Sequence, residues 1–222
     1  MYDKIKANSV EAKNQLSNYI VFHNPEGKSK RVIFAGNSIT LHGPKEEIGW
    51  YGNHGMAASK EENDYVHILM RKFTEEYGDC AFCVCQVSKW EHNDFNNGDC
   101  LDLYIEARNF NADVVIARFV ENYPTNGFDA GVFEKEYIKL IDHLNPTKNA
   151  EVIFTSSFWR HPADEIIKKV ATQKNGAFVY LGDLGENDKM QALGLFSHNG
   201  VAIHPGDKGM AEIASRIWNA RK

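Results

Sequence analysis

The most informative stretch of the sequence is Val32-Ile33-Phe34-Ala35-Gly36-Asn37-Ser38-Ile39-Thr40. A run of β-branched and aromatic residues stops at a glycine and a small polar pair follows, which is typical of a buried strand that ends in a tight turn. In open α/β sheets, ligands lie beyond the carboxyl ends of the strands. We therefore expect Ser38 in the functional crevice, either as a nucleophile or as a cap of the next helix.

Four further apolar segments are expected to be strands, and helical patterns alternate with them. The expected strands span residues 81–87, 112–119, 152–155 and 177–181, and the expected helices lie near residues 62–77, 99–109, 133–144, 166–171 and 210–217. Continuous apolar strands separated by helices are typical of a parallel sheet that is covered on both faces. The sequence therefore predicts an α/β fold, a flavodoxin-like three-layer α/β/α sandwich with a five-stranded parallel sheet in the order 2-1-3-4-5.

Length and charge limit the class of protein. The chain has 222 residues, of which 43% are hydrophobic, enough for one substantial core. We expect a single domain over residues 1–222, in which residues 1–30 form an N-terminal helical extension with a helix over 8–22. The net charge of -5 gives no basic face, so nucleic acid is not an expected partner. No segment is apolar enough for a membrane span, and we expect a cytoplasmic protein, with a homo-oligomer left open.

A serine hydroxyl is a weak nucleophile until a neighbouring base takes its proton. Among the nine histidines, His204 lies between the last expected strand and the last expected helix. A loop in that position can fold back over Ser38. Because an imidazole titrates near neutral pH, His204 is suited to accept that proton and to return it.

Three short segments carry a resemblance to a known family. Gly36-Asn37-Ser38-Ile39-Thr40 resembles the first, GDS-type block of the SGNH, or GDSL-like, hydrolase superfamily, and His204-Pro205-Gly206-Asp207-Lys208-Gly209 resembles its last block. Arg118-Phe119-Val120-Glu121-Asn122 resembles the third block. The resemblance covers the chain from about Arg31 to Ala220. It implies that Ser38 attacks an acyl carbonyl, that His204 is the general base and then the general acid, and that the Ser38 N–H and the Asn122 side-chain amide donate to the oxyanion.

The chain departs from this family at two oxyanion positions. The second block of the family supplies a further backbone N–H from a glycine, but Val87-Ser88-Lys89-Trp90-Glu91 contains none. Since any residue can offer its backbone N–H, Lys89 or Trp90 is the expected donor here. Val120 also replaces the glycine that is common in the third block.

A third departure concerns the group that orients the histidine. The family usually has an aspartate three residues before the histidine, and this chain has Val201 there. The orienting group is therefore Asn199, Asp183, a backbone carbonyl or nothing, because a base can act without an acid partner. Asp207 is expected to cap the last helix.

Two residues near these blocks are candidates for substrate contact. Trp50 lies in a long connection, residues 41–59, and such connections are usually functional. An aromatic side chain there can line a sugar or acyl pocket or pack in the rim. Glu121 flanks the third block and either contacts substrate or forms a structural ion pair with Arg118.

We therefore expect a serine esterase that hydrolyses small acyl esters, with acetyl groups on carbohydrates as one substrate class. A thioesterase or lysophospholipase on the same fold, and a binding protein without turnover, are the alternatives. The mechanism uses Ser38 and His204 and implies no cofactor and no metal. The cysteines are expected to be buried free thiols rather than ligands of a metal or redox site, and they are Cys80, Cys83, Cys85 and Cys100.

Overall fold

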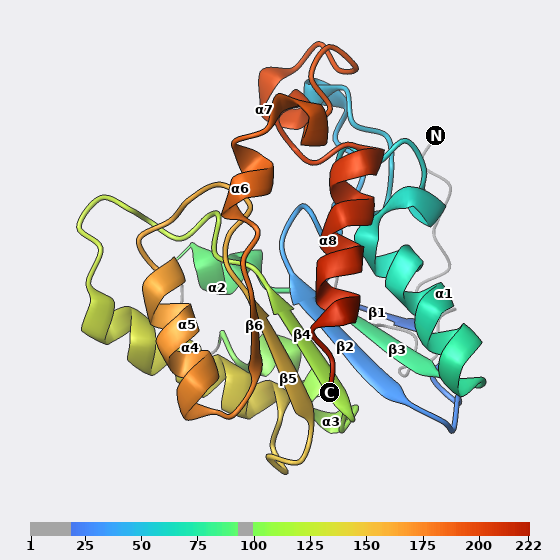
Figure 1. Ribbon diagram of the computed structural model, residues 1–222, viewed down its shortest axis with the longest axis vertical. Helices are drawn as coiled ribbons and strands as arrows, with labels where there is room; N and C mark the ends of the chain where they lie inside the picture. The colour runs from blue at the N-terminus through green and yellow to red at the C-terminus, as the bar shows by residue number, and fades with distance from the viewer. Residues whose placement is uncertain (1–18, 93–99) are drawn as a thin grey trace, which may run out of the picture.

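The computed structural model describes residues 19–92 and 100–222, and its centre is a six-stranded sheet (Figure 1). The strands lie in the order β1-β3-β2-β4-β5-β6. The neighbouring pairs from β3 to β6 are parallel, which confirms the expected order of the five parallel strands. The strands are β1 (Ile20–His23), β2 (Arg31–Gly36), β3 (Ala81–Gln86), β4 (Val114–Arg118), β5 (Glu151–Thr155) and β6 (Ala177–Val179).

The sheet has one strand more than the sequence predicts. β1 pairs antiparallel with β3, so that Ile20 lies opposite Cys85. The expected helix over residues 8–22 is therefore wrong at its carboxyl-terminal end. The Ile20-Val21-Phe22 run is β-branched and aromatic, and it completes the edge of the sheet beside β3. Residues 1–18 lie outside the described part of the chain, and the single domain over residues 1–222 stays a prediction.

Helices cover both faces of the sheet and make three layers (Figure 1). One face carries α1 (Tyr65–Tyr77) and α8 (Asp207–Asn219), which share a core with Val32 and Phe34 of β2. The other face carries α3 (Ile105–Asn109), α4 (Ala130–Leu144) and α5 (Asp164–Gln173), which pack with Ile33 and Ala35. Because successive side chains of a strand point to opposite faces, a strand with helices on both sides needs apolar residues throughout.

The four cysteines belong to these cores. All of them are buried free thiols, as expected from the sequence. Cys83 and Cys85 lie in β3, and burial raises the pKa of both thiols. They pack as small apolar side chains.

Short helices and 3-10 turns shape the connections at one end of the sheet. The two long connections, residues 37–64 and 180–206, lie beyond the carboxyl ends of β2 and β6, where α6 and α7 form the top of Figure 1. Isolated bridges join His42 to His54 and Lys45 to Trp50 in the first connection. The short helices and 3-10 turns of the described chain are α2 (Ser88–Glu91), α6 (Gly182–Gly185), α7 (Asn199–Ala202), η2 (Glu46–Ile48), η3 (Glu61–Asn63), η5 (Asp102–Tyr104) and η6 (Asp188–Met190).

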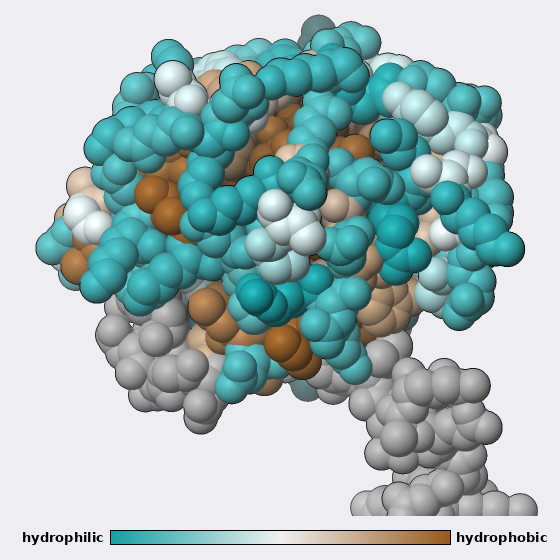
Figure 2. Space-filling model, turned by 90° about the horizontal axis from the view of Figure 1, so that it is seen from below, coloured by the Kyte–Doolittle hydropathy of each residue, from teal (hydrophilic) through white to brown (hydrophobic). Residues whose placement is uncertain are grey.

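The opposite end of the molecule is seen from below in Figure 2. Hydrophilic side chains cover most of the described surface there, and hydrophobic side chains show through between them. Within the described ranges, no helix combines the length and the apolar character that a membrane crossing requires.

Candidate active site

Ser38 lies in a tight turn directly after β2. The carbonyl of Asn37 accepts hydrogen bonds from the N–H groups of Thr40 and Leu41, both at 2.9 Å. A Cβ at Gly36 would lie 1.7 Å from Thr40 Oγ1, so this turn requires glycine. The Ser38 carbonyl is fixed by the Met56 N–H at 2.8 Å. No helix begins at Ser38 in the described chain, so the interpretation of Ser38 as a helix cap is wrong.

The hydroxyl of Ser38 faces an imidazole. Ser38 Oγ lies 2.9 Å from His204 Nε2, although the two residues are 166 positions apart. His204 lies between α7 and α8, and its Nδ1 is 2.6 Å from the carbonyl oxygen of Gly200. A carbonyl oxygen only accepts hydrogen bonds, so Nδ1 carries the proton and Nε2 presents a lone pair to the Ser38 hydroxyl.

The surroundings of His204 keep its imidazole neutral. The Trp159 and His204 rings form a T-shaped pair with a centroid distance of 5.1 Å and an interplanar angle of 80°. Burial lowers the pKa of His204 to about 4, mainly because the imidazolium is desolvated. At neutral pH the ring is therefore in the form that accepts a proton.

The two side chains that the sequence offered as orienting groups do not take that position. The Asp183 carboxylate forms a two-pronged ion pair with Arg216 of α8, at 2.6 and 2.8 Å. Asn199 begins α7, and the Gly200 carbonyl that follows it is the acceptor. Val201, at the family's aspartate position, is fully buried, where a carboxylate would be desolvated. Of the four options, the backbone carbonyl is the one found.

Asp207 does not have its expected role as a helix cap. It is the first residue of α8, but its carboxylate does not cap that helix. It accepts hydrogen bonds from the Ser59 N–H and hydroxyl at 2.7 and 2.6 Å and from Asn63 Nδ2 at 2.8 Å. Asp207 therefore ties the first long connection to α8, which follows His204 directly.

A pocket of about 360 Å³ opens beside Ser38 and His204. In the described ranges, no group of three or more His, Cys, Asp or Glu side chains is placed to hold a metal ion. The lining is mainly polar, and its residues are Ser38, His42, Lys45, Ile48, Met56, Gln86, Ser88, His92, Asn122, His198, Gly200 and His204.

Trp50 is not part of this lining. Its side chain is only 3% exposed, and its Nε1 donates to the His42 carbonyl at 3.0 Å. It packs against His54 and Phe196 in a small core under the loops. The expectation of substrate contact is wrong for Trp50, because the first connection folds over the indole ring.

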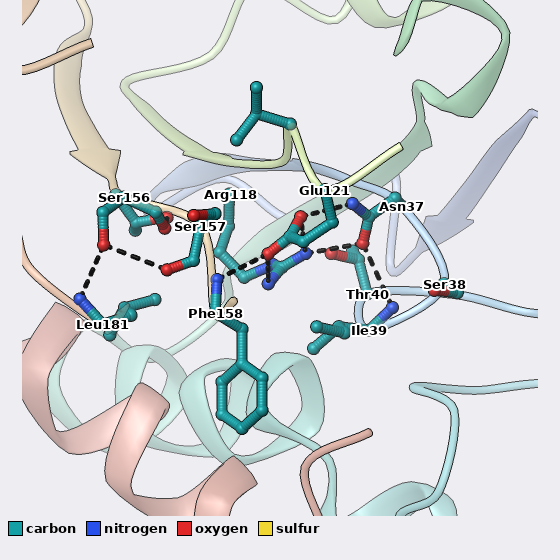
Figure 3. Close-up of polar contacts among 12 residues, drawn as sticks. Asn37, Ser38, Ile39, Thr40, Arg118, Glu121, Ser156, Ser157, Phe158 and Leu181 are labelled. Carbon is teal, nitrogen blue, oxygen red and sulfur yellow. Dashed lines mark hydrogen bonds and ion pairs between the residues drawn. The ribbon is translucent and has the colours of Figure 1, made fainter. Parts of the chain in front are cut away.

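Glu121 is also removed from the pocket and is held in a buried ion pair (Figure 3). Arg118 Nη1 lies 2.9 Å from Glu121 Oε1, and the side chains are 0% and 3% exposed. The same carboxylate accepts from the Phe158 N–H at 2.8 Å and from Asn37 Nδ2 at 2.5 Å. Burial alone would raise the pKa of Glu121, but the Arg118 guanidinium lowers it below its usual value. The structural ion pair is thus the correct alternative, and it joins the ends of β2, β4 and β5.

Asn122 is the third-block residue that reaches the pocket. Its side-chain amide lines the pocket, and Nδ2 donates to Glu91 Oε2 at 2.7 Å. An amide nitrogen has two N–H groups, so one further donor is available at this position. Val120, two residues before Asn122, has a φ of 134°, a conformation that strains a β-branched side chain.

The predicted second-block donors are not at the pocket. Trp90 is fully buried with its ring in the core, and its N–H is directed to the Tyr104 hydroxyl at 3.3 Å. Lys89 is exposed on α2, and Ser88 is the residue of that helix that lines the pocket. The Ser88 N–H donates to Gln86 Oε1 at 2.8 Å.

Sequence reasoning did not single out Glu91 or Gly200. Glu91 follows β3 in a segment that matches no family block, and nothing in its local pattern separates it from a surface glutamate. Gly200 acts through its carbonyl, which every residue has. Only the placement of these groups against Asn122 and His204 distinguishes them.

Comparisons with known proteins support the fold. No model of a protein family and no curated protein matches the chain. LAE5, an alpha/beta hydrolase enzyme from the metagenome of Lake Arreo, Spain, is 16% identical, with a TM-score of 0.54 over 89% of this chain and 97% of that chain. A GDSL-like lipase from Parabacteroides merdae ATCC 43184 is 16% identical, with a TM-score of 0.55 over 87% of this chain and 96% of that chain.

A third similar structure is a two-domain esterase (CEX) active on acetylated mannans. It is 16% identical, with a TM-score of 0.55 over 88% of this chain and 49% of that chain, so the chain corresponds to about half of that protein. The chain therefore has the fold of GDSL-like lipases and esterases, in agreement with the resemblance of its motifs to the SGNH hydrolases.

Proposed function

We propose that this protein is a serine esterase of the SGNH type that hydrolyses small acyl esters. The observation that carries the proposal is the 2.9 Å distance between Ser38 Oγ and His204 Nε2 at the wall of the pocket. A general base has to lie within hydrogen-bond reach of the proton that it removes. The tautomer that the Gly200 carbonyl imposes directs the lone pair of the base at that proton.

The proposed reaction proceeds through an acyl-enzyme. His204 Nε2 takes the hydroxyl proton as Ser38 Oγ forms a bond to the acyl carbon, and the carbonyl oxygen becomes an oxyanion. The Ser38 N–H and Asn122 Nδ2 are the proposed donors to that oxyanion. When the tetrahedral intermediate collapses, the ester C–O bond breaks and His204 returns the proton to the leaving alcohol. Water, deprotonated by His204, then attacks the acyl carbon and releases the acid and the Ser38 hydroxyl.

The shape of the pocket favours a small acyl group on a polar alcohol. A pocket of about 360 Å³ lies at the small end of the range for ligand sites, and its lining is mainly polar. An acetyl group on a carbohydrate fits these properties, and one structural neighbour acts on acetylated mannans. A thioesterase or lysophospholipase would need a long apolar channel from Ser38.

The test compares the hydrolysis of p-nitrophenyl acetate by the unmodified chain and by Ser38→Ala. We expect the variant to lose about 10³-fold or more of kcat, because nucleophile and base act as a unit. Ser29→Ala is the matched control, because Ser29 is an exposed serine. It precedes the amino-terminal end of β2, whereas Ser38 follows the carboxyl-terminal end of that strand. Equal rates in the unmodified chain and in Ser38→Ala would favour a binding protein without turnover.

Substrate class is tested with the same proteins. We expect p-nitrophenyl acetate to be hydrolysed with a higher kcat/KM than p-nitrophenyl octanoate, and an acetylated manno-oligosaccharide to release acetate in a Ser38-dependent way. A preference for octanoate would point to the thioesterase or lysophospholipase alternative.

A further inference from the structure

Glu91 is a buried carboxylate that connects three neighbouring strand ends. It follows β3, its side chain is 0% exposed, and it accepts hydrogen bonds from groups that follow β2 and β4. Its Oε2 accepts from Asn122 Nδ2 at 2.7 Å. Its Oε1 accepts from Asn37 Nδ2 at 2.8 Å and from the Val120 N–H at 2.5 Å. Every one of these partners is a donor.

The contact with Asn122 fixes which end of that amide faces Glu91. A carboxylate oxygen accepts hydrogen bonds from Nδ2 and repels Oδ1. With one N–H of Nδ2 on Glu91, the second N–H of the same nitrogen remains as the donor on the pocket side. If the amide turned over, its carbonyl oxygen would take the place of that donor.

We infer that Glu91 is a positioning residue, which holds the Asn122 amide in the one orientation that can donate to the oxyanion. The inference rests on the proposed esterase function. Glu91 does not line the pocket in the described structure and acts only through Asn122, Asn37 and the bend at Val120.

The two other hydrogen-bond partners of Glu91, Asn37 and Val120, lie next to the nucleophile and just before Asn122. Asn37 precedes Ser38, and its Nδ2 donates to both Glu91 and Glu121, so the turn that carries the nucleophile is fixed to the same carboxylate. The Val120 N–H points to Glu91 from a residue with a φ of 134°. Glu91 therefore holds the strained bend that leads from β4 to Asn122.

The neighbouring charges and hydrogen bonds determine whether Glu91 is ionised. Glu121, from the segment after β4, is the neighbouring carboxylate, and it is paired with Arg118. Burial, and then the charge of Glu121, raise the pKa of Glu91, whereas its three hydrogen-bond donors lower it. The ionised form of Glu91 thus depends on the donors that it orients, and Asn122 is one of them.

The first experiment is a double-mutant cycle with p-nitrophenyl acetate, using the unmodified chain, Glu91→Gln, Asn122→Ala and the double variant. In Glu91→Gln, the new NH2 group faces Asn122 Nδ2, and the Asn122 amide turns over to relieve the contact between two donors. We expect Asn122→Ala to lower kcat by about 10²-fold. Glu91→Gln should lower kcat to a similar degree with KM little changed, and the double variant should be no slower than Asn122→Ala.

Asn145→Asp is the matched control. It makes the reverse exchange, from an amide to a carboxylate, in another buried network, in which Asn145 bonds to the backbone of Ala150 before the start of β5. It should lower the thermal midpoint of unfolding and leave kcat unchanged. Equal losses of kcat in Asn145→Asp and Glu91→Gln, or a Glu91→Gln effect that persists in full in the Asn122→Ala background, would overturn the inference.

A spectroscopic readout separates this inference from the proposed function. The side-chain NH2 resonances of Asn122 can be assigned by their loss in Asn122→Ala. We expect Glu91→Gln to shift them and to speed their exchange with solvent, while Asn145→Asp leaves them in place. Unchanged resonances in Glu91→Gln contradict the positioning inference even if no ester is hydrolysed, whereas a chain without Ser38-dependent hydrolysis contradicts only the proposed function.

Discussion

His204 Nδ1 lies 2.6 Å from the carbonyl oxygen of Gly200, at the place where the SGNH family usually has an aspartate carboxylate. The carbonyl gives the imidazole the same tautomer and orientation as a carboxylate would, but it carries no negative charge. The imidazolium that forms during the reaction is therefore stabilised less. Burial lowers the pKa of His204, and the hydrogen bond to Gly200 opposes that shift without cancelling it.

The first prediction concerns pH. Because the pKa of His204 is lowered to about 4, its neutral form persists far below the usual value of 6.5. The titration of His204 should therefore lower Ser38-dependent kcat/KM only as the pH approaches 4, separately from any change near pH 7 that comes from Glu91, whose pKa is raised to about 7 by burial and by the charge of Glu121. Measurements across the acid range, with circular dichroism at each pH to correct for unfolding, check this. A half-maximal rate near 6.5 that persists in Glu91→Gln would show that His204 titrates like a solvated histidine.

The lowered pKa of His204 should also make the free energy of unfolding depend on pH. In the unfolded chain His204 titrates near its usual value, so unfolding takes up a proton below about pH 6.5. The contribution of His204 to the free energy of unfolding should decline as the pH falls from there to about 4. Urea unfolding of the unmodified chain and of His204→Gln should therefore differ in pH dependence over this window.

The second prediction concerns the orienting group. Asp183→Asn and Asn199→Ala should keep the kcat/KM of the unmodified chain, because neither side chain holds the His204 ring. Asp183→Asn removes a partly exposed ion pair with Arg216, which should cost at most about 1 kcal/mol of unfolding free energy. A loss of kcat in Asp183→Asn as large as that in His204→Gln would place a carboxylate on the imidazole in solution.

The third prediction tests the strain at Val120. Val120→Ala and Val120→Gly both remove the buried isopropyl group, but only alanine keeps a Cβ at a φ of 134°. The glycine variant should therefore be the more stable of the two, by about 1 kcal/mol. Val115 in β4 is the control, because it is a fully buried valine in a regular strand. There the alanine variant should be the more stable one.

The fourth prediction compares a buried ion pair with an exposed one. Glu121→Ala leaves the Arg118 guanidinium buried without its carboxylate, and it should lower the free energy of unfolding by about 3–5 kcal/mol. Glu136→Ala breaks a pair with Lys139 at the same i,i+3 spacing on the surface of α4. That loss should stay below about 1 kcal/mol. Urea unfolding of both variants gives the comparison, and similar losses would contradict a structural ion pair at Glu121.

Much of the fold follows from local patterns in the sequence. The apolar run that ends at Gly36 predicts β2 and the turn with Ser38, because a strand buried on both faces is apolar throughout and a tight turn after it excludes a Cβ. The same patterns predict the other four parallel strands and place Asn122 and His204 after strand ends, whereas the strand order is set by pairing between distant segments. The features other than the strand order depend on residues close together in the sequence.

Other features depend on contacts between distant segments, and only the tertiary structure decided them. β1 forms because β3 leaves an open edge, and the short run Ile20-Val21-Phe22 does not by itself show that this edge is there. The folded loop buries Trp50, and the ends of β2 and β5 enclose Glu121, so two residues that seemed suited to substrate contact became structural. The Gly200 carbonyl and the Glu91 carboxylate acquired their positions in the same way. No sequence motif distinguishes a backbone carbonyl or a single glutamate from the many others in a chain. The role of each depends on the group that folding places against it.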